Sequence, residues 1–262
     1  MTTTIVFASE KGGVGKTTSA VNLAMAFVVG GYKVLLIDMD PQGSVRFSFG
    51  IKGPVKLGTR QLLLDPSVPV DKLIYPGNGS GMDYIFANID TLDEEKELSA
   101  VMNDPYALQR RIVSEGQRYD FIILDAPAST SLLTINALTA ADLVILPLQC
   151  ESLAMKSLKR FLLAFKTLQR KVNPGLRIAG ILLTMYDRSL EVHRRISREV
   201  YDTLQDSVFQ TIIPKVKEIT EASALGQSVI TYSINSVGAT AYIRLSKEIL
   251  DRFGLRPDNG RR

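Results

Sequence analysis

The sequence has only one cysteine and one histidine among its 262 residues. A single cysteine, Cys150, excludes an internal disulfide bond and fits a protein of a reducing compartment. Cys150 ends an apolar run, which predicts a small buried side chain. His193 stands in a polar, arginine-rich stretch, so we expect it to be exposed. Neither residue indicates a metal site or a catalytic nucleophile.

Long apolar runs are also missing. No run approaches the ~20 residues that a membrane-spanning helix needs, and no basic segment leads into an apolar core as in a secretory signal. These features predict a cytoplasmic protein. The composition, 45% hydrophobic and 22% charged, is ordinary for a globular chain. Its length fits one large domain, expected over residues 1–254, with a polar, basic and disordered tail at 255–262.

Residues 11–18 read Lys-Gly-Gly-Val-Gly-Lys-Thr-Thr and carry the strongest chemical signal in the chain. An apolar, β-favouring run precedes them, and a pattern of helical period follows. Strand, glycine-rich turn and helix form the context of a phosphate-binding loop. Backbone N–H groups and the positive helix end would hold phosphates, Lys16 would reach the β- and γ-phosphates, and Thr17 would bind Mg²⁺. The sequence therefore predicts a nucleoside triphosphate site made by Lys11, Gly12, Gly13, Val14, Gly15, Lys16, Thr17 and Thr18.

Two further apolar runs end in carboxylates. Residues 34–37 are followed by Asp38-Met39-Asp40-Pro41-Gln42-Gly43, and residues 121–124 by Asp125-Ala126-Pro127. The carboxyl ends of parallel strands form the ligand-binding edge of a sheet, and Mg²⁺ prefers oxygen ligands. Asp38 and Asp125 are therefore predicted to join Thr17 at a metal site. The alternative for either aspartate is a helix N-cap after a strand.

Strand-like and helical patterns alternate along the chain. Several strand runs are almost wholly apolar, as in a parallel sheet covered on both faces. We therefore expect an α/β fold with a doubly wound, mostly parallel sheet and helices on both faces. The expected strands are residues 4–8, 33–37, 82–86, 119–124, 143–148, 178–183 and 208–213. A helix is expected directly after the loop, with Val21, Ala24, Met25 and Val28 on one face, and others near 105–115, 130–140, 152–172, 188–204 and 238–253. Residues 50–81 are expected to be irregular.

The loop departs from the general phosphate-loop pattern, because Glu10 stands where its first glycine is expected and Lys11 follows. It resembles the deviant Walker A loop of the ParA/MinD family of ATPases. The resemblance implies ATP and Mg²⁺ as cofactors, a P-loop NTPase fold and an ATP-dependent homodimer in which Lys11 contacts the partner's nucleotide. It also implies that Asp40 positions the attacking water, and that the segments containing Met185 and Pro214 flank adenine. Because the chain begins close to the loop, it is similar to the small, chromosomal, Soj-like ParA proteins.

Basic residues gather in one part of the sequence, although the net charge is only +4. Residues 156–198 hold eleven lysines and arginines and two acids, and one face of the helix expected at 152–172 is basic. Such a face fits sequence-independent contact with DNA phosphates, or simply a solvated surface. The chain departs from the family at Ala128, where the family has a proline. It also has Glu218 at the position where the small ParA proteins carry an arginine that contacts DNA. The DNA-contacting residues are therefore predicted to be Arg188, Arg194, Arg195, Lys215 and Lys217.

These observations predict a ParA-like ATPase that binds DNA non-specifically on the nucleoid and partitions DNA or positions a cargo. A ParB-like or cargo-adaptor protein would stimulate its slow hydrolysis, and a membrane is not expected as a partner. The first alternative is a MinD-like membrane-cycling ATPase, since the C-terminal helical pattern is amphipathic and basic. The second is a metabolic relative. Among those, the nitrogenase iron protein needs paired cysteines, and no ligase substrate pocket can be recognised.

Overall fold

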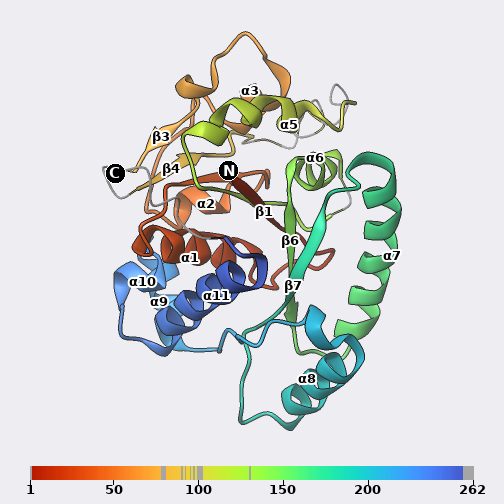
Figure 1. The fold of residues 1–262 in the computed structure, drawn as a ribbon. Helices are drawn as coiled ribbons and strands as arrows, with labels where there is room; N and C mark the ends of the chain where they lie inside the picture. Colours follow the sequence, from red (N-terminus) through yellow and green to blue (C-terminus); the bar gives the residue numbers. More distant parts are fainter. Residues whose placement is uncertain are drawn as a thin grey trace.

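The computed structural model describes residues 2–77, 81–89, 91, 93–94, 96, 98, 103–129 and 131–255. Its centre is a seven-stranded sheet in the order β3-β4-β2-β5-β1-β6-β7 (Figure 1). Six strands are parallel, and only the short edge strand β3 runs antiparallel, against β4. The strands are β1 (Thr3–Phe7), β2 (Val34–Asp38), β3 (Tyr75–Pro76), β4 (Met82–Ile85), β5 (Phe121–Asp125), β6 (Leu143–Gln149) and β7 (Arg177–Thr184).

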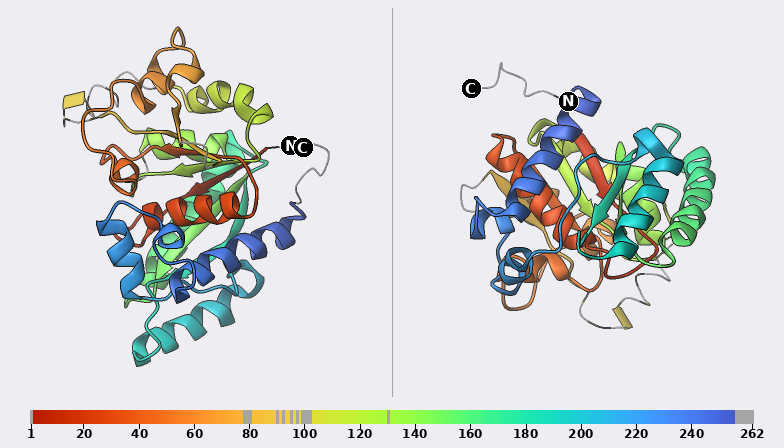
Figure 2. Two further views of the ribbon diagram at one scale, coloured as in Figure 1. Left: turned by 90° about the vertical axis from the view of Figure 1, so that its left-hand side faces the viewer. Right: turned by 90° about the horizontal axis from the view of Figure 1, so that it is seen from below.

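Helices cover both faces of this sheet (Figures 1 and 2). One face carries α1 (Lys16–Val29), α2 (Ser44–Phe47), α9 (Lys217–Ala224), α10 (Val229–Tyr232) and α11 (Val237–Phe253). The other carries α3 (Thr59–Leu64), α5 (Ala107–Ile112), α6 (Leu132–Ala140), α7 (Ala154–Val172) and α8 (Glu191–Leu204). Short 3₁₀ turns lie at Val70–Lys72, Val113–Gln117 and Gln205–Ser207. The fold is the expected doubly wound α/β architecture.

The strand sequences explain this two-sided burial. Successive side chains of a strand point to opposite faces, and in β1 both Ile5 and Phe7 pack under α1 and α11 while Val6 packs under the helices of the other face. Every residue of β2 and β5 is buried. A strand with two covered faces is expected to be apolar throughout. The buried carboxylates of Asp38 and Asp125, which end β2 and β5, are therefore exceptions that call for a functional explanation.

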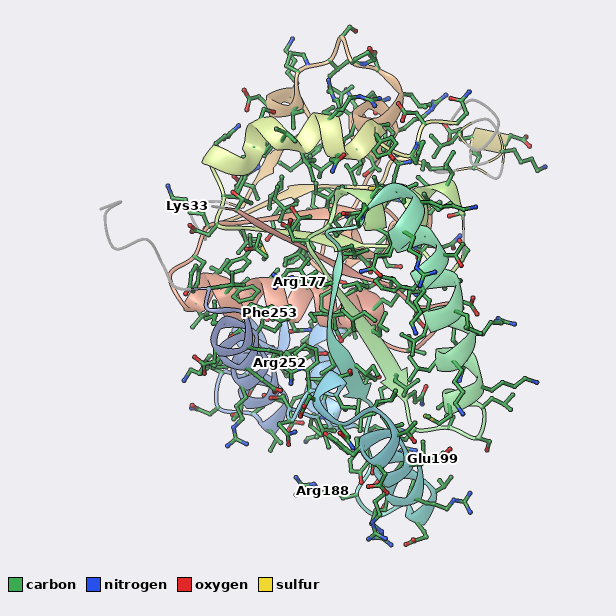
Figure 3. The ribbon with its side chains drawn as sticks, turned by 45° about the vertical axis from the view of Figure 1, so that its right-hand side comes forward. Lys33, Arg177, Arg188, Glu199, Arg252 and Phe253 are labelled. Atoms are coloured by element: carbon green, nitrogen blue, oxygen red, sulfur yellow. The ribbon has the colours of Figure 1, made fainter. Side chains whose placement is uncertain are left out.

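The strand expected at residues 208–213 does not form. The segment runs beside β7. Ile181 of β7 forms a single bridge with Val208, and Tyr186, just beyond the end of β7, forms another with Pro214. The backbone N–H groups of Gln210 and Thr211 donate instead to the carboxylate of Glu248, at 2.7 and 2.9 Å. The side chain of Arg252, labelled in Figure 3, donates to the carbonyl of Val208 at 3.2 Å. Backbone bonds to β7 remain on either side, from Phe209 to Ile181 and from Ile213 to Leu183, so α11 interrupts the ladder at its centre.

Other expectations need smaller corrections. Residues 50–77 are not wholly irregular, because α3, a 3₁₀ turn and β3 lie there. The helix expected at 105–115 is shorter and continues as a 3₁₀ turn, and the helix expected from 188 begins at Glu191. His193 is buried rather than exposed. Its Nδ1 accepts a hydrogen bond from the N–H of Asp187 at 3.0 Å. Cys150 is buried as expected. The predicted tail, apart from Leu255, lies outside the described residues.

Candidate active site

The turn between β1 and α1 has the backbone of a phosphate-binding loop. Gly13 and Gly15 have φ angles of +74° and +84°, in the left-handed region where only glycine is unstrained. Gly15 is the N-cap of α1, and no side chain caps the helix there. The first N–H groups of α1 therefore face the loop, where a helix end attracts phosphate. The local sequence alone predicts this geometry.

Lys16 and Asp125 form the charged centre of the site. Lys16 is only 7% exposed, and its pKa is lowered by burial, although the charges of Asp125 and Asp40 oppose the shift. Burial raises the pKa of Asp125 to about 7, while the Thr17 hydroxyl and Lys16 act in the opposite direction. The structure thus brings together Lys16, Thr17, Asp40 and Asp125, which the sequence places on three separate segments.

Asp38 lies beside Asp125, because the two are register partners on the adjacent strands β2 and β5. Its carboxylate accepts the N–H of Asp40 and the N–H of Val45, both at 3.1 Å. Burial, and then the charge of Asp125, raise the pKa of Asp38 well above its usual value. Asp38 therefore anchors the loop that carries Asp40 and the start of α2.

A Mg²⁺ ion fits this group of residues. Both carboxylate oxygens of Asp125 are fully buried, and apart from the adjacent Thr17 hydroxyl no group of the described chain satisfies them. Two buried carboxylates side by side are costly unless a cation compensates them. Among the described residues no three His, Cys, Asp or Glu side chains could hold a metal by themselves. A nucleotide phosphate and water would supply the remaining oxygen ligands, as is usual for Mg²⁺.

A cavity of about 460 Å³ opens beside the loop. Gly15 and Thr18 line one side, Met185 and Pro214 line another, and α9 closes it with Ile219, Thr220 and Ser223. The Thr184 hydroxyl at the end of β7 donates to the Val14 carbonyl at 2.9 Å, which fixes this wall against the loop. The predicted adenine-flanking residues Met185 and Pro214 are therefore brought to the phosphate loop.

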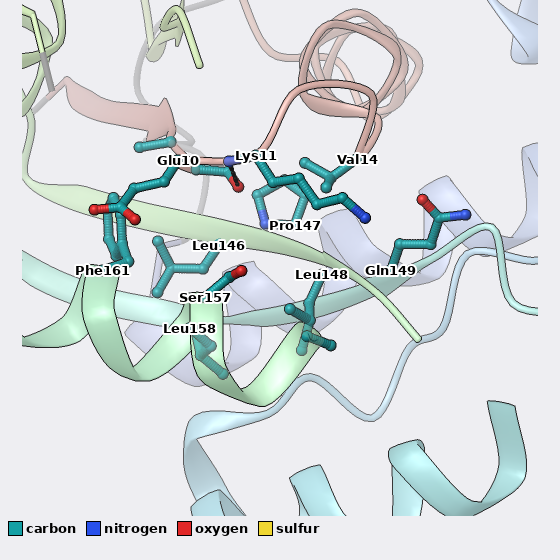
Figure 4. A pocket seen from close by; sticks show the side chains of 13 residues that line it. Glu10, Lys11, Val14, Leu146, Pro147, Leu148, Gln149, Ser157, Leu158 and Phe161 are labelled. Carbon is teal, nitrogen blue, oxygen red and sulfur yellow. Dashed lines mark hydrogen bonds between the residues drawn. The ribbon is translucent and has the colours of Figure 1, made fainter. Parts of the chain in front are cut away.

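Lys11 is held by its own subunit. Its ammonium pairs with Glu151 just before α7, and the adjacent Glu10 pairs with Arg160 on α7. Figure 4 shows the Glu10 and Lys11 side chains pointing in different directions above α7, over a small pocket lined by Leu146, Leu158 and Phe161. Sequence reasoning missed Glu151, because nothing in the local pattern connects residues 140 positions apart.

Two polar links between α1 and the C-terminal helices were also missed. The side chain of Asn22 donates to the Thr18 carbonyl and accepts the N–H of Val229, both at 2.7 Å. The hydroxyls of Ser19 and Tyr242 are 3.3 Å apart in the core. Tyr242 also lines the cavity of about 460 Å³, so α11 supports the loop from behind.

The predicted DNA-contacting residues are all exposed. Arg188 and Lys215 line a groove of about 770 Å³ together with Arg244 from α11, a residue that the sequence analysis did not select. Pro214 and Lys215 line both this groove and the cavity beside the phosphate loop. Arg194 pairs with Glu191 on the same helix. The basic residues expected on α7 share its exposed face, namely Lys156, Lys159, Arg160, Lys166, Arg170 and Lys171.

Comparisons with known proteins agree with this geometry. A family model described as an AAA domain matches residues 2–178. The sporulation initiation inhibitor protein Soj of Bacillus subtilis is 38% identical over 246 residues, which span 94% of this chain and 97% of that protein. The chromosome partitioning protein ParA of Caulobacter vibrioides is 34% identical over 250 residues, or 95% and 94% of the two chains. The chain belongs to the ParA/Soj family of partition ATPases.

Solved structures of two further proteins share the fold. A cobyrinic acid a,c-diamide synthase from Mycobacterium smegmatis, bound to an ATP analogue and magnesium, is 32% identical with a TM-score of 0.81, covering 97% of this chain and 96% of that one. The septum site-determining protein MinD of Pyrococcus horikoshii, complexed with Mg-ADP, is 27% identical with a TM-score of 0.78, covering 95% and 96%. The ParA/Soj assignment rests on the sequence relatives, and these structures confirm the P-loop fold.

Proposed function

We propose that this ParA-type ATPase binds ATP with Mg²⁺, dimerises when ATP is bound, attaches to DNA without sequence preference and releases it after hydrolysis. The observation that carries the proposal is the convergence of Lys16, Thr17, Asp40 and Asp125 beside a cavity that a nucleotide base would fill. A role in DNA partitioning is supported by relatives that are named for chromosome partitioning.

The residues divide the work of the ATPase reaction. Lys16 and the N–H groups of the loop would bind the β- and γ-phosphates, and Thr17 and Asp125, with Asp38 beside them, would hold Mg²⁺. Bound Mg²⁺ would neutralise charge that develops on the phosphate oxygens. Asp40 lies on a loop that Asp38 fixes in place, so it is suited to orient a water molecule toward the γ-phosphate. Met185 and Pro214 would enclose the base.

Dimerisation would complete the site. Lys11 is paired with Glu151 within one subunit, and both side chains are about half exposed. A surface ion pair of this kind contributes only ~0–1 kcal/mol, so Lys11 can exchange Glu151 for a phosphate of the partner's ATP at little cost. A ParB-like or cargo-adaptor protein would then accelerate hydrolysis.

DNA would bind at the groove lined by Arg188, Lys215 and Arg244, with Lys217, Arg194 and Arg195 adding positive charge nearby. Figure 3 places Arg188 at the end of the molecule opposite Lys33. Because Lys215 also lines the nucleotide cavity, nucleotide occupancy can influence this surface directly. Association with the nucleoid would follow from such binding.

The membrane alternative loses support from the packing of α11. Its apolar side chains, including Tyr242, Leu245 and Ile249, are buried against the sheet and α1. They are therefore not available to enter a lipid surface. No helix in the described part of the chain is long and apolar enough to cross a membrane.

Binding to random-sequence duplex DNA tests the proposal. The ATP-bound protein should bind, the ADP-bound protein should not, and log affinity should fall with log salt by about 0.9 per neutralised phosphate. Liposomes of anionic lipid serve as the control surface. If the ATP-bound protein sediments with liposomes but does not bind DNA, the proposal of a DNA-binding ATPase is wrong and the membrane-cycling alternative is favoured.

A further inference from the structure

Two glycines that end two different helices lie against each other beside the nucleotide site. Gly50 follows α2, where the N–H groups of Gly50 and Ile51 donate to the carbonyls of Phe47 and Arg46. Gly226 follows α9 in the same way, because the N–H groups of Gly226 and Gln227 donate to Ser223 and Ala222. Both glycines have a φ of +66°. Each thus closes its helix in the left-handed conformation that glycine favours.

The two glycines approach so closely that one of them cannot carry a side chain. A Cβ on Gly226 would lie 2.3 Å from the nitrogen of Gly50, 2.5 Å from its Cα and 3.2 Å from the carbonyl oxygen of Phe47. A Cβ on Gly50 would meet nothing closer than 3.9 Å. The contact is therefore backbone against backbone, and neither partner can yield as a flexible side chain would.

This contact connects the two sides of the nucleotide site. The Asp38 carboxylate holds the N–H groups of Asp40 and Val45 and so fixes the start of α2. Gly226 bears on the end of α2, and α9, which Gly226 terminates, supplies Ile219, Thr220 and Ser223 to the outer wall of the cavity. The Asp40 loop leads into α2, and the turn at the end of α2 meets the end of α9 at a contact between residues 176 positions apart in sequence (226 − 50).

We infer that the Gly50–Gly226 contact positions α9 against α2 and, through α2, against the loop of Asp40. The cavity wall formed by α9 and the Asp40 loop then move together when a nucleotide binds. This rests on the proposed ATP site. Nucleotide that draws the Asp40 loop toward its γ-phosphate would draw α9 with it, and Lys217 on the first turn of α9 would follow. Coupling between sites is carried by packed contacts and rigid secondary elements that can adopt two arrangements, and this contact joins two such elements.

Substitution of Gly226 by alanine tests the inference against two matched controls. Gly50→Ala imposes the same strain at a φ of +66° but no clash, and Gly31→Ala lies at a φ of +89° with open space around its Cβ. A displacement of about 1 Å can cost up to ~100-fold in rate. We expect Gly226→Ala to raise the KM for ATP and the Kd for a fluorescent ATP analogue about tenfold and to lower kcat, with both controls within about threefold.

The change in KM separates positioning from stability, because partial unfolding lowers apparent kcat but leaves the KM of the folded fraction unchanged. If Gly226→Ala and Gly50→Ala give the same KM and Kd, the contact is only packing and the inference fails. If the unaltered protein does not bind the analogue, the proposed ATP site fails instead.

Hydrogen exchange on the unaltered protein keeps the test independent of whether Gly226→Ala folds. Addition of a non-hydrolysable ATP analogue with Mg²⁺ should slow amide exchange in residues 44–51 and 217–227 together, and the concentration for half the effect should agree. Protection of residues 44–51 without any change in residues 217–227 would overturn the inference.

Discussion

Lys11 pairs with Glu151 across 140 residues of sequence, so the residue that distinguishes this phosphate loop is engaged within its own subunit. We expect Glu151→Gln to strengthen ATP-dependent dimerisation, because Lys11 then no longer has to break an ion pair with Glu151 before it contacts the partner's nucleotide. An exposed pair contributes ~0–1 kcal/mol, so the gain should be about two- to fivefold per subunit. Sedimentation velocity with ATP and Mg²⁺ measures it, and Glu10→Gln, which breaks the neighbouring pair with Arg160, is the control. Weaker dimerisation of Glu151→Gln would contradict this account.

Lys16→Ala should abolish measurable ATP binding. The substitution removes the nearly buried cation that is expected to meet the β- and γ-phosphates. Titration with a fluorescent ATP analogue measures the loss, and thermal melting verifies that the variant is folded. Near-normal affinity would refute the assignment of the phosphate loop.

Asp40→Ala should separate nucleotide binding from hydrolysis. If Asp40 only orients water, the variant binds ATP, dimerises and stays on DNA while its turnover falls by about 100-fold or more. Size-exclusion chromatography with ATP and Mg²⁺ should then show a persistent dimer. A monomer under these conditions, or unchanged turnover, would assign Asp40 a different role.

Asp125→Asn should stabilise the metal-free protein while it impairs the ATPase. The raised pKa of Asp125 shows that its charged form is disfavoured by burial, so removal of the charge relieves a cost present in the folded state. We expect a gain of about 1–2 kcal/mol, or roughly 2–8 °C in Tm for a domain of this size. Differential scanning calorimetry in EDTA measures it. A lower Tm would mean that the carboxylate has a compensating partner.

The DNA surface can be tested by charge. Lys215→Ala/Lys217→Ala should weaken binding of the ATP-bound protein to DNA and flatten its salt dependence, by about 0.9 in slope for each phosphate that the variant no longer neutralises. Glu218→Arg should tighten binding, because it adds a cation beside Lys217. Lys33→Ala/Lys72→Ala removes equal charge from exposed positions outside the proposed groove and should change little. Equal effects of the two double variants would show that only net charge matters.

Much of the site could be predicted because its chemistry is local. The glycines of residues 12–15, the lysine and threonine that follow, and the aspartates that end β2 and β5 each lie next to the strand that positions them. Parallel strands end at a common edge, so the convergence of Asp38 and Asp125 follows from the strand pattern. The expected burial of Cys150 followed from local pattern too.

Two of the errors involve backbone groups that bond to side chains. Residues 208–213 are apolar enough for a strand, but Glu248 on α11 takes their central N–H groups. His193 looked exposed among arginines, but a turn at Asp187 donates to its ring. In each case a side chain satisfies a backbone N–H, from a distant helix for residues 210–211 and from six residues along the chain for Asp187, and neither propensity nor periodicity identifies that partner.

The sequence by itself determined the nucleotide chemistry and the parallel α/β fold, since both depend on residues adjacent in the chain. Only the tertiary structure decided how the site is completed. It pairs Lys11 with Glu151, ties Asn22 to Val229 and sets Gly226 against Gly50. Contacts between distant segments depend on how whole helices pack on the sheet, and packing is a property of the assembled core rather than of any local pattern.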